Sequence, residues 1–580
     1  MKFSTDISNI LVIGCGGAGL RSAIEAKKEG LSVKILGKRN KDDAHTVLAA
    51  GGINAAFGNV DNLDSWEQHF ADTYIEGYGI GDPEIIEIMT RESPNLVSEI
   101  DKWGSDFAKL INGDIDQRFF GAHTYRRTCY CGDYTGQSIL KTLLKKTQSL
   151  EIPIFDSQYV TELLVKDNVC FGAFSFNTKT GEKTAHYADA VILCTGGHTR
   201  IWKKSSSRKY ENNGDGFYLG LKAGCELIDM EMVQFHPTGM LFPEEVAGTL
   251  VTEAVRGEGG RLFNSLGERF MTKYDPERME LSTRDRVAIA NYTEILEGRG
   301  TSKGGVYLDI SHKSKDLITR KLPKIYRQFI ELQNLDITKN PMEVAPTAHY
   351  SMGGIMVSAR EHKTCVNGLF AAGEVAGGLH GANRLGGNSL AEILVFGKKA
   401  GQSASNYSKK LKSQIRSAEI VQNTYENLET LKQTGDELSL PLQTKLYDIM
   451  WEHAGVVKNK SALKEGLTKI NKVEEDIKHV EVRTEDNNYT DLINILDLKA
   501  SLMTAKATLV SALTRKESRG AHQRSDFKIC KSDNNFSYKI KLENNELTIT
   551  SNQKHELKEE LKVYVDNTKN ISNFKNKLLE

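Results

Sequence analysis

The spacing of hydrophobic and polar positions at the start of the chain predicts a strand, a turn and a helix. Residues 9–13 (NILVI) form a short continuous apolar run, and residues 17–28 place apolar positions with a helical period. A second apolar run follows at residues 31–36 (LSVKIL). Two strands joined through a helix are the unit of a parallel sheet, so we expect the chain to begin as a Rossmann-type α/β domain.

Similar patterns predict the elements that follow. Amphipathic periodicity indicates helices, and alternation or short apolar runs indicate strands. The expected elements are helices at 63–76, 83–103 and 135–149, three short antiparallel strands within 159–187, and one buried strand at 188–197.

The second half of the chain changes character several times. From about Met230 it is mixed, near residue 345 the glycine-rich α/β pattern resumes, and beyond about Lys409 it becomes charged and helical. Helices are expected at 420–433, 442–453, 463–479 and 491–515, with a hairpin at 537–550 and a final helix in a tail without evident chemistry.

A glycine-rich turn separates the first strand from the first helix. Gly14, Gly16 and Gly19 form G-x-G-x-x-G, in which the first glycine permits a tight turn, the second lets backbone approach a pyrophosphate, and the third lets helix pack on strand. This context favours dinucleotide binding. The second strand ends in Gly37-Lys38-Arg39, without the usual acidic ribose ligand. That departure fits either the 2′-phosphate of NADP or a flavin whose ribose is held differently.

His45 lies close behind this turn, in the small-residue stretch AHTVLAAGGIN. It is either a partly buried, hydrogen-bonded imidazole or a nucleophile joined covalently to a flavin. A later loop, QRFFGAHTYRRTCYCGDYTG, is rich in aromatic and basic residues. Its residues His123, Arg126 and Arg127 either face a bound ligand or lie on a solvated surface.

Composition limits the classes of function. A chain of 580 residues is too long for one core, and no apolar run approaches the ~18 residues that cross a bilayer, so membrane contact is expected only through a partner. Lys plus Arg and Asp plus Glu number 76 each, which gives no general attraction to nucleic acid. The eight cysteines are scattered, so we expect no zinc or iron–sulfur site and free thiols in a reducing cytosol. The first strand begins too early to leave room for a targeting peptide.

Eight motifs along residues 8–527 occur in an order that is more specific than any single motif. They are GCGGAG, AHTVLAAGG, FHPTG, TEAVRGEGG, TRD, HYSMGG, GEVAGGLHGANRLGGNSLAE and RKESRGAHQRSD. Together they resemble the flavoprotein subunits of succinate dehydrogenase and fumarate reductase, although L-aspartate oxidase shares many of them. His45-Thr46-Val47, Gly239 after HPT, and the last motif favour the succinate and fumarate branch.

The resemblance implies a fold and a division of the chain. The fold is an FAD-binding, glutathione-reductase-like Rossmann domain with an inserted capping domain and a C-terminal helical domain. The implied divisions are 1–235 and 345–408 for the FAD-binding domain, 236–344 for the capping domain, 409–527 for the helical domain and 528–580 for the tail.

The resemblance also implies which residues act. Two carboxylates on the substrate require several cationic or hydrogen-bonding groups around the flavin. The catalytic residues would be Arg284, Glu253 and Arg256, and the substrate-binding residues His236, Thr252, His349, Arg384 and Phe120. The FAD-binding residues would be Gly14, Gly16, Gly17, Gly19, Lys38, His45, Thr46, Gly51, Gly52, Asp133, Gly196, Asp215, Glu374, Asn388, Ser389 and Leu390, with FAD attached covalently through His45 and no metal.

By the same resemblance, the chain would pass electrons to an iron–sulfur subunit, which would pass them through a membrane anchor to a quinone. It would then sit peripherally at the cytoplasmic face of a membrane. Two departures bear on the redox direction and the cofactor contacts: Ala50 and Gly37 stand where the family more often has polar residues. A soluble aspartate oxidase and a non-catalytic flavin-binding protein remain alternatives.

Overall fold

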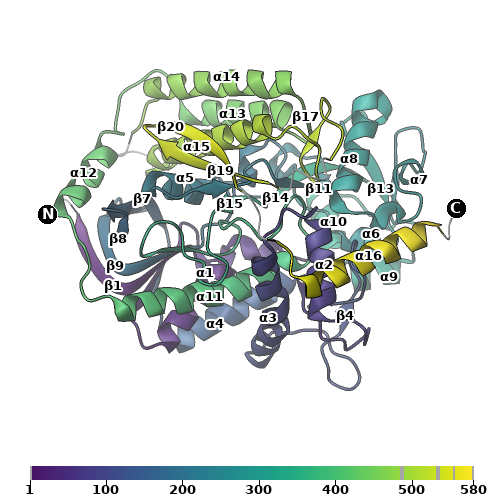
Figure 1. The fold of residues 1–580 in the computed structure, drawn as a ribbon. Coiled ribbons are helices and arrows are strands. Elements are labelled where there is room, and N and C mark those ends of the chain that lie inside the picture. Colours follow the sequence, from purple (N-terminus) through teal and green to yellow (C-terminus); the bar gives the residue numbers. More distant parts are fainter. Residues whose placement is uncertain (1–2, 484–488, 531–535, 553–555, 578–580) are drawn as a thin grey trace.

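A seven-stranded sheet forms the base of the predicted Rossmann core (Figure 1). The computed structural model describes residues 3–483, 489–530, 536–552 and 556–577. The residues of β1 from Ile10 to Ile13 are at most 4% exposed, because opposite faces of the strand pack into two different hydrophobic clusters. The sheet order is β6 (Ile154–Phe155), β2 (Val33–Leu36), β1 (Ser4–Ile13), β9 (Lys183–Leu193), β8 (Val169–Asn177) and β7 (Gln158–Lys166), with β16 (Leu369–Ala371) also beside β9.

The chain directions in this sheet fit the predicted connections. Strand β1 pairs in parallel with β2 and β9, β2 pairs in parallel with β6, and β9 pairs in parallel with β16. On the other side of β9, the strands β8 and β7 form an antiparallel insertion. The expected third short strand and the strand expected at 188–197 are one continuous strand, β9, so their separation was wrong. No glycine, proline or asparagine interrupts the chain between Lys183 and Leu193, and the strand therefore has no reason to break.

Helices cover the sheet and place the glycine turn. Helix α1 (Gly17–Lys28) follows β1 directly and packs along α11 (Asn388–Lys410), with Gly397 and Gly401 permitting the close approach. The other helices of this region are α2 (Trp66–Glu76), α3 (Pro83–Lys102), α4 (Thr135–Ser149) and α5 (Asp215–Ala223), and the short strands are β3 (Ile53–Asn54), β4 (Gln117–Arg118) and β5 (Thr128–Cys129).

A second, antiparallel sheet carries the segment expected to cap the core. Its own hydrophobic cluster includes Met240, Leu262 and Val344. The sheet order is β11 (Val233–Met240), β14 (Met342–Ser351), β13 (Val306–Asp309) and β12 (Arg261–Phe263), and its helices are α6 (Ala254–Gly257), α7 (Met271–Tyr274), α8 (Arg284–Glu294), α9 (Lys315–Lys321) and α10 (Pro323–Gln333).

The C-terminal region consists of helices and a tail that returns to the core. The expected hairpin forms as β19 (Ser537–Glu543) and β20 (Glu546–Asn552), and β19 pairs with β10 (Leu227–Ile228), which also pairs with β15 (Gly354–Ile355). The expected final helix forms as α16 (Glu559–Lys577) and packs against α2 (Figure 1). The helices before the tail are α12 (Ala418–Glu429), α13 (Ser439–His453), α14 (Lys460–Asp476) and α15 (Thr490–Thr514), and a short ladder joins β17 (Val457–Lys458) to β18 (Gln523–Arg524). In the described part of the chain, no helix is both long enough and apolar enough to cross a membrane.

Candidate active site

A cavity of about 550 Å³ opens where the parallel strands β1, β2 and β9 end. Its lining also comes from the segment after β2, from β11 and β14 of the second sheet, and from the start of α11. Ligands of open α/β sheets bind outside the carboxyl ends of the strands, and this cavity has that position. The N-terminus of α1 also faces it, which favours a phosphate group there.

The glycine turn has the predicted close contacts. A Cβ on Gly14, whose φ is +114°, would lie 2.1 Å from the carbonyl oxygen of Cys194, and one on Gly19 would lie 1.9 Å from that of Gly14. Gly14, Gly16 and Gly17 line the cavity, whereas Gly19 lies behind the turn and lets α1 approach β1. Thr46 Oγ1 accepts a hydrogen bond of 3.1 Å from the backbone of Gly17. The turn and the His45 segment are thus fixed to each other.

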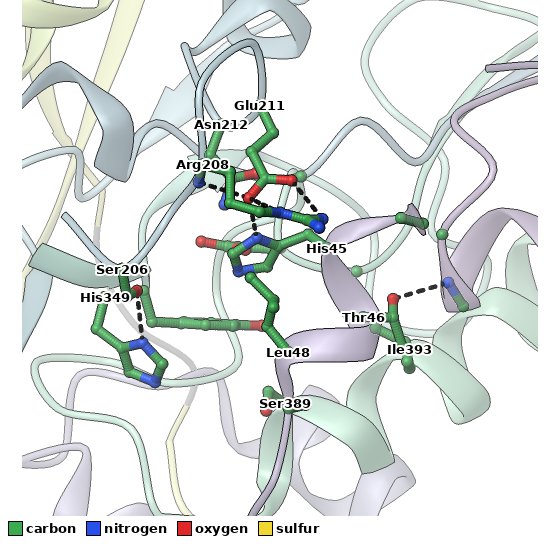
Figure 2. A pocket seen from close by; sticks show the side chains of 18 of the residues that line it. His45, Thr46, Leu48, Ser206, Arg208, Glu211, Asn212, His349, Ser389 and Ile393 are labelled. Atoms are coloured by element: carbon green, nitrogen blue, oxygen red, sulfur yellow. Dashed lines mark hydrogen bonds and ion pairs between the residues drawn. The ribbon is translucent and has the colours of Figure 1, made fainter. Parts of the chain in front are cut away.

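His45 lies in a short 3₁₀ turn, His45–Leu48, at the wall of the cavity (Figure 2). Its Nδ1 donates a hydrogen bond of 2.9 Å to Glu211 Oε1, and Arg208 binds the same carboxylate and Asp43. Burial disfavours charge on the imidazole, but the Glu211 carboxylate outweighs it and raises the pKa of His45. Burial alone would raise the pKa of Glu211, but His45 and Arg208 hold the pKa of this carboxyl far below its ordinary value.

Lys38 lines the cavity, and its ammonium group is ion-paired with two carboxylates. Its Nζ lies 2.6 Å from Asp497 and 3.3 Å from Asp215, and Tyr159 donates a hydrogen bond of 2.8 Å to Asp497. Asp215 and Asp497 therefore place carboxylates beside the end of β2, where the second strand itself supplies none. Because both bind Lys38, that lysine is not a free cation for a 2′-phosphate.

Most of the remaining cofactor candidates line the cavity, and two do not. Burial raises the pKa of Glu374 to about 7, and its carboxylate accepts a hydrogen bond of 2.9 Å from the backbone of Ser351. Asp133 lies outside the lining and accepts a hydrogen bond from the backbone of Lys324. Asn388 is also outside the lining, where it is fully buried and bonded to Asn54. The candidates that do line it are Gly51, Gly52, Gly196, Asp215, Glu374, Ser389 and Leu390.

At the other end of the cavity, two guanidinium groups share one acceptor. Gln234 Oε1 accepts from Arg284 at 3.2 Å and from Arg384 at 3.0 Å. Arg284 Nε also lies 2.8 Å from Glu253 Oε2. Burial, together with the charge of Arg284, lowers the pKa of Arg384 to about 10. The arrangement concentrates positive charge where a dianionic ligand would be stabilised.

Two imidazoles face this end in their neutral form. The rings of His236 and His349 lie 5.3 Å apart, edge to face. Burial lowers the pKa of His236 well below its ordinary value, and nearby Arg284 lowers it further; the pKa of His349 is lowered by burial and by the charges of Arg384 and Arg284. Ser206 Oγ and His349 Nδ1 are hydrogen-bonded at 2.9 Å (Figure 2). The predicted residues that line this end are His236, Thr252, Glu253, Arg284, His349, Arg384 and Phe120.

Arg256 is the catalytic candidate that does not line the cavity. It is 1% exposed and its guanidinium donates a hydrogen bond of 2.5 Å to the backbone oxygen of Glu280. Burial lowers its pKa, although the Glu253 carboxylate opposes that effect. Its Nε and one terminal nitrogen have no partner within the described structure. Arg256 is thus buried outside the cavity lining, near enough to Glu253 for the charge of that carboxylate to act on its pKa.

The basic and aromatic loop is mostly internal. Arg127 is fully buried between Asp64 and Asp72, His123 binds the backbone oxygen of Gly386, and Phe120 lines the cavity. Of the three residues His123, Arg126 and Arg127, only Arg126 lies on a solvated surface, where its half-exposed side chain pairs with Asp61.

Three residues in or beside the cavity escaped the sequence analysis. Gln234 lies two residues before His236 in VQFHP, which was a signal within reach. Glu211 is 166 residues from its partner His45 in the sequence, and Asp497 is 459 residues from its partner Lys38, so only the fold brings each pair together. Across the residues that the structure describes, no group of three or more His, Cys, Asp or Glu side chains is placed to hold a metal ion.

Comparisons with known proteins agree with this cavity. Residues 9–390 match the family model of the FAD binding domain, and residues 443–573 match that of the fumarate reductase flavoprotein C-terminus. One chain of the fumarate reductase (CoM/CoB) of Methanothermobacter marburgensis is 43% identical over 521 residues, covering 90% of this chain and 94% of that protein. A succinate dehydrogenase flavoprotein subunit from Rickettsia conorii is 36% identical over 544 residues, covering 90% of each.

A solved structure of E. coli quinol fumarate reductase is similar with a TM-score of 0.91 and 31% identity, covering 96% of this chain and 98% of that one. These matches confirm the predicted fold class and the flavin alternative for the dinucleotide site, and they identify FAD as the cofactor.

Proposed function

The chain belongs to the family of succinate dehydrogenase and fumarate reductase flavoprotein subunits, a family of FAD-dependent oxidoreductases, and we propose that it interconverts succinate and fumarate. The observation that carries the proposal is the pair Arg284 and Arg384 on Gln234, at the end of a cavity whose other end is the glycine turn. Such a pair matches two carboxylates separated by a short carbon chain.

FAD fits the residues of the cavity. The close contacts at Gly14 and the N-terminus of α1 suit a pyrophosphate, and the paired Lys38, Asp215 and Asp497 suit the adenosine end. We propose that His45 Nε2 bonds covalently to the flavin, because its Nδ1 is committed to Glu211. FAD supplies hydride transfer to or from a substrate carbon.

The two ends of a dicarboxylate would be held by different groups. Arg284 and Arg384 provide charge-assisted hydrogen bonds, while the neutral His236 and His349 donate hydrogen bonds without adding further like charge beside the arginines. Phe120, which is 6% exposed, adds an apolar wall that excludes water. This arrangement would fix the central carbon–carbon bond against the cofactor.

We propose that a proton moves along Arg284, Glu253 and Arg256. Arg284 Nε is bonded to Glu253 at 2.8 Å. The charge of Glu253 also acts on the pKa of Arg256, which has two buried nitrogens without a partner among the described residues. In the direction of fumarate reduction, Arg284 donates the proton to the substrate carbon and regains one through Glu253. The alternative is that Arg284 only clamps a carboxylate.

Electrons would pass to an iron–sulfur subunit, which would pass them through a membrane anchor to a quinone. Support comes from the names of the relatives, which are flavoprotein subunits and a quinol fumarate reductase. The complex would then sit peripherally at the cytoplasmic face of a membrane. Because one relative is named a fumarate reductase (CoM/CoB), CoM and CoB should be tested as donors beside quinols.

One purification tests these proposals together. The chain isolated with its partners should reduce a dye with succinate and should not do so with aspartate, and acid precipitation should leave flavin fluorescence on its band. Activity with aspartate alone would identify an aspartate oxidase, and bound FAD without either activity would identify a non-catalytic flavoprotein. Addition of quinol or of thiols to the fumarate assay identifies the electron donor.

A further inference from the structure

The C-terminal helix α16 is docked on α2 by buried side chains. Leu561 and Val565 are 1% and 2% exposed and join the hydrophobic cluster that contains Phe70 and Ala71 of α2. The intervening Val563 is 57% exposed, so α16 presents one face to the core. Lys558 also lies 2.7 Å from Glu87 of α3.

One polar contact of α16 continues into the core. Gln68 of α2, 9% exposed, directs its amide Nε2 at three acceptors: Thr568 Oγ1 at 2.9 Å, Asp72 Oδ1 at 3.0 Å and Thr124 Oγ1 at 3.2 Å. Asp72 in turn accepts from the backbone and hydroxyl of Thr124, at 2.9 and 2.6 Å. Helix α16 is thereby linked to the segment at Thr124.

That segment, residues 119–124, contributes Phe120 to the wall of the ligand end of the cavity. Phe120 lines the cavity, and the backbone of Gly121 donates a hydrogen bond of 3.2 Å to Glu253 Oε1. Ala122 has a φ of +67°, a conformation that costs a non-glycine residue energy and that its surroundings must hold in place. The wall therefore depends on contacts at its end, where Thr124 is bound by Gln68 and Asp72.

We propose that α16 is a brace for the ligand end of the cavity, acting through Gln68 as a positioning residue. Docking of α16 holds the Gln68 amide toward Thr124, which fixes the wall and with it Phe120 and the hydrogen bond of Gly121 to Glu253. The expectation that the tail carries no evident chemistry is thereby refined: the described part of the tail contributes no residue to the cavity lining, but α16 would position residues that do line it. The inference rests on the proposed dicarboxylate function only for its kinetic readout.

The test compares two substitutions on the same helix in the full chain with its partners. Val565→Asp places a charge in the buried face of α16, and Val563→Asp places the same charge on its exposed face. Val565→Asp should raise hydrogen exchange at the amides of residues 120–124 and raise KM for fumarate about fivefold, the change expected for loss of about one buried hydrogen bond. FAD content should not change, and Val563→Asp should match the wild type.

Gln68→Ala and the milder Thr568→Val separate the brace from general destabilisation. Gln68→Ala should reproduce the effect of Val565→Asp, and the double variant should add little, because both remove one connection. Thr568→Val should act in the same direction and Thr568→Ser should restore the wild-type KM. Faster hydrogen exchange in α16 of Val565→Asp, with unchanged exchange at residues 120–124 and an unchanged KM, would show that α16 does not brace the cavity. The exchange measurement decides this even if the wild type shows no dicarboxylate turnover, which would refute only the proposed function.

Discussion

The imidazole of His45 and the carboxylate of Glu211 form a hydrogen bond of 2.9 Å at the wall of the FAD cavity. The bond fixes the ring so that Nδ1 carries the proton and Nε2 keeps its lone pair, and it raises the pKa of His45. A more basic nitrogen is a better nucleophile once it is deprotonated. Glu211 thus both orients and activates the side chain proposed to hold FAD.

Removal of the imidazole should abolish covalent flavin without abolishing flavin binding. His45→Ala leaves the glycine turn and the Lys38 cluster intact, so FAD should still bind but should be released by acid. The measurement is flavin fluorescence of the acid-precipitated band, with His312→Ala on the exposed surface as the control. Acid-stable fluorescence in His45→Ala would place the attachment elsewhere.

The pair should also make stability depend on pH within a definite window. The pKa of His45 is raised from 6.5, so its contribution is full below 6.5 and is lost as pH rises through the folded pKa. The pKa of Glu211 is lowered from 4.5, so its contribution is present above 4.5 and is lost as pH falls. The flavin-free Glu211→Gln variant should therefore be destabilised most between pH 4.5 and 6.5, by about 1 to 3 kcal/mol.

Thermal or urea unfolding of the flavin-free wild type and the flavin-free Glu211→Gln variant across pH 4 to 9 measures this difference. The stability difference between the two proteins should narrow above the folded pKa of His45, leaving the part due to Arg208 and Arg39. A stability difference that is flat across the whole range would show that His45 does not titrate with Glu211.

The parts of the fold that the sequence predicted are those set by local pattern. The helix expected at 135–149 has those bounds in the structure, because its amphipathic face and flanking turn are both local. The error at β9 also has a local cause: a change from alternating to fully apolar residues marks a change in burial, not a strand end.

The site was predictable where motifs are contiguous and not where the fold joins distant segments. The glycine turn and the Arg284 and Arg384 motifs indicated their places, whereas the Lys38 pair with Asp497 joins residues 459 positions apart. Asp497 lies in the mostly apolar and buried helix α15, and nothing near it in the sequence names Lys38 as its partner. The contact of α16 with Gln68, across 500 positions, is of the same kind.

Replacement of Arg284 should separate proton transfer from binding. Arg284→Lys keeps a positive charge but cannot bond Gln234 and Glu253 at once as the guanidinium does, and it loses the link through Nε to Glu253, so kcat should fall at least about 100-fold. Arg286→Lys, on the same helix and 60% exposed, is the matched control. Steady-state fumarate reduction at saturating substrate is the measurement, and an unchanged kcat would leave Arg284 only a carboxylate clamp.

Gln234 offers the sharpest test of the two-arginine end, because a single oxygen accepts from both Arg284 and Arg384. Gln234→Glu keeps the shape but adds a negative charge that pairs with both guanidinium groups and repels a dianion. KM for succinate and fumarate should rise about 10- to 100-fold, as expected from a change of about 1.5 to 3 kcal/mol in charged hydrogen bonds. Gln328→Glu adds the same charge to the lining, where the Gln328 amide bonds Met240 and Leu250 and not the arginines, and it should raise KM far less. Equal effects of the two variants would mean that net charge in the cavity, and not the shared oxygen of Gln234, governs dicarboxylate binding.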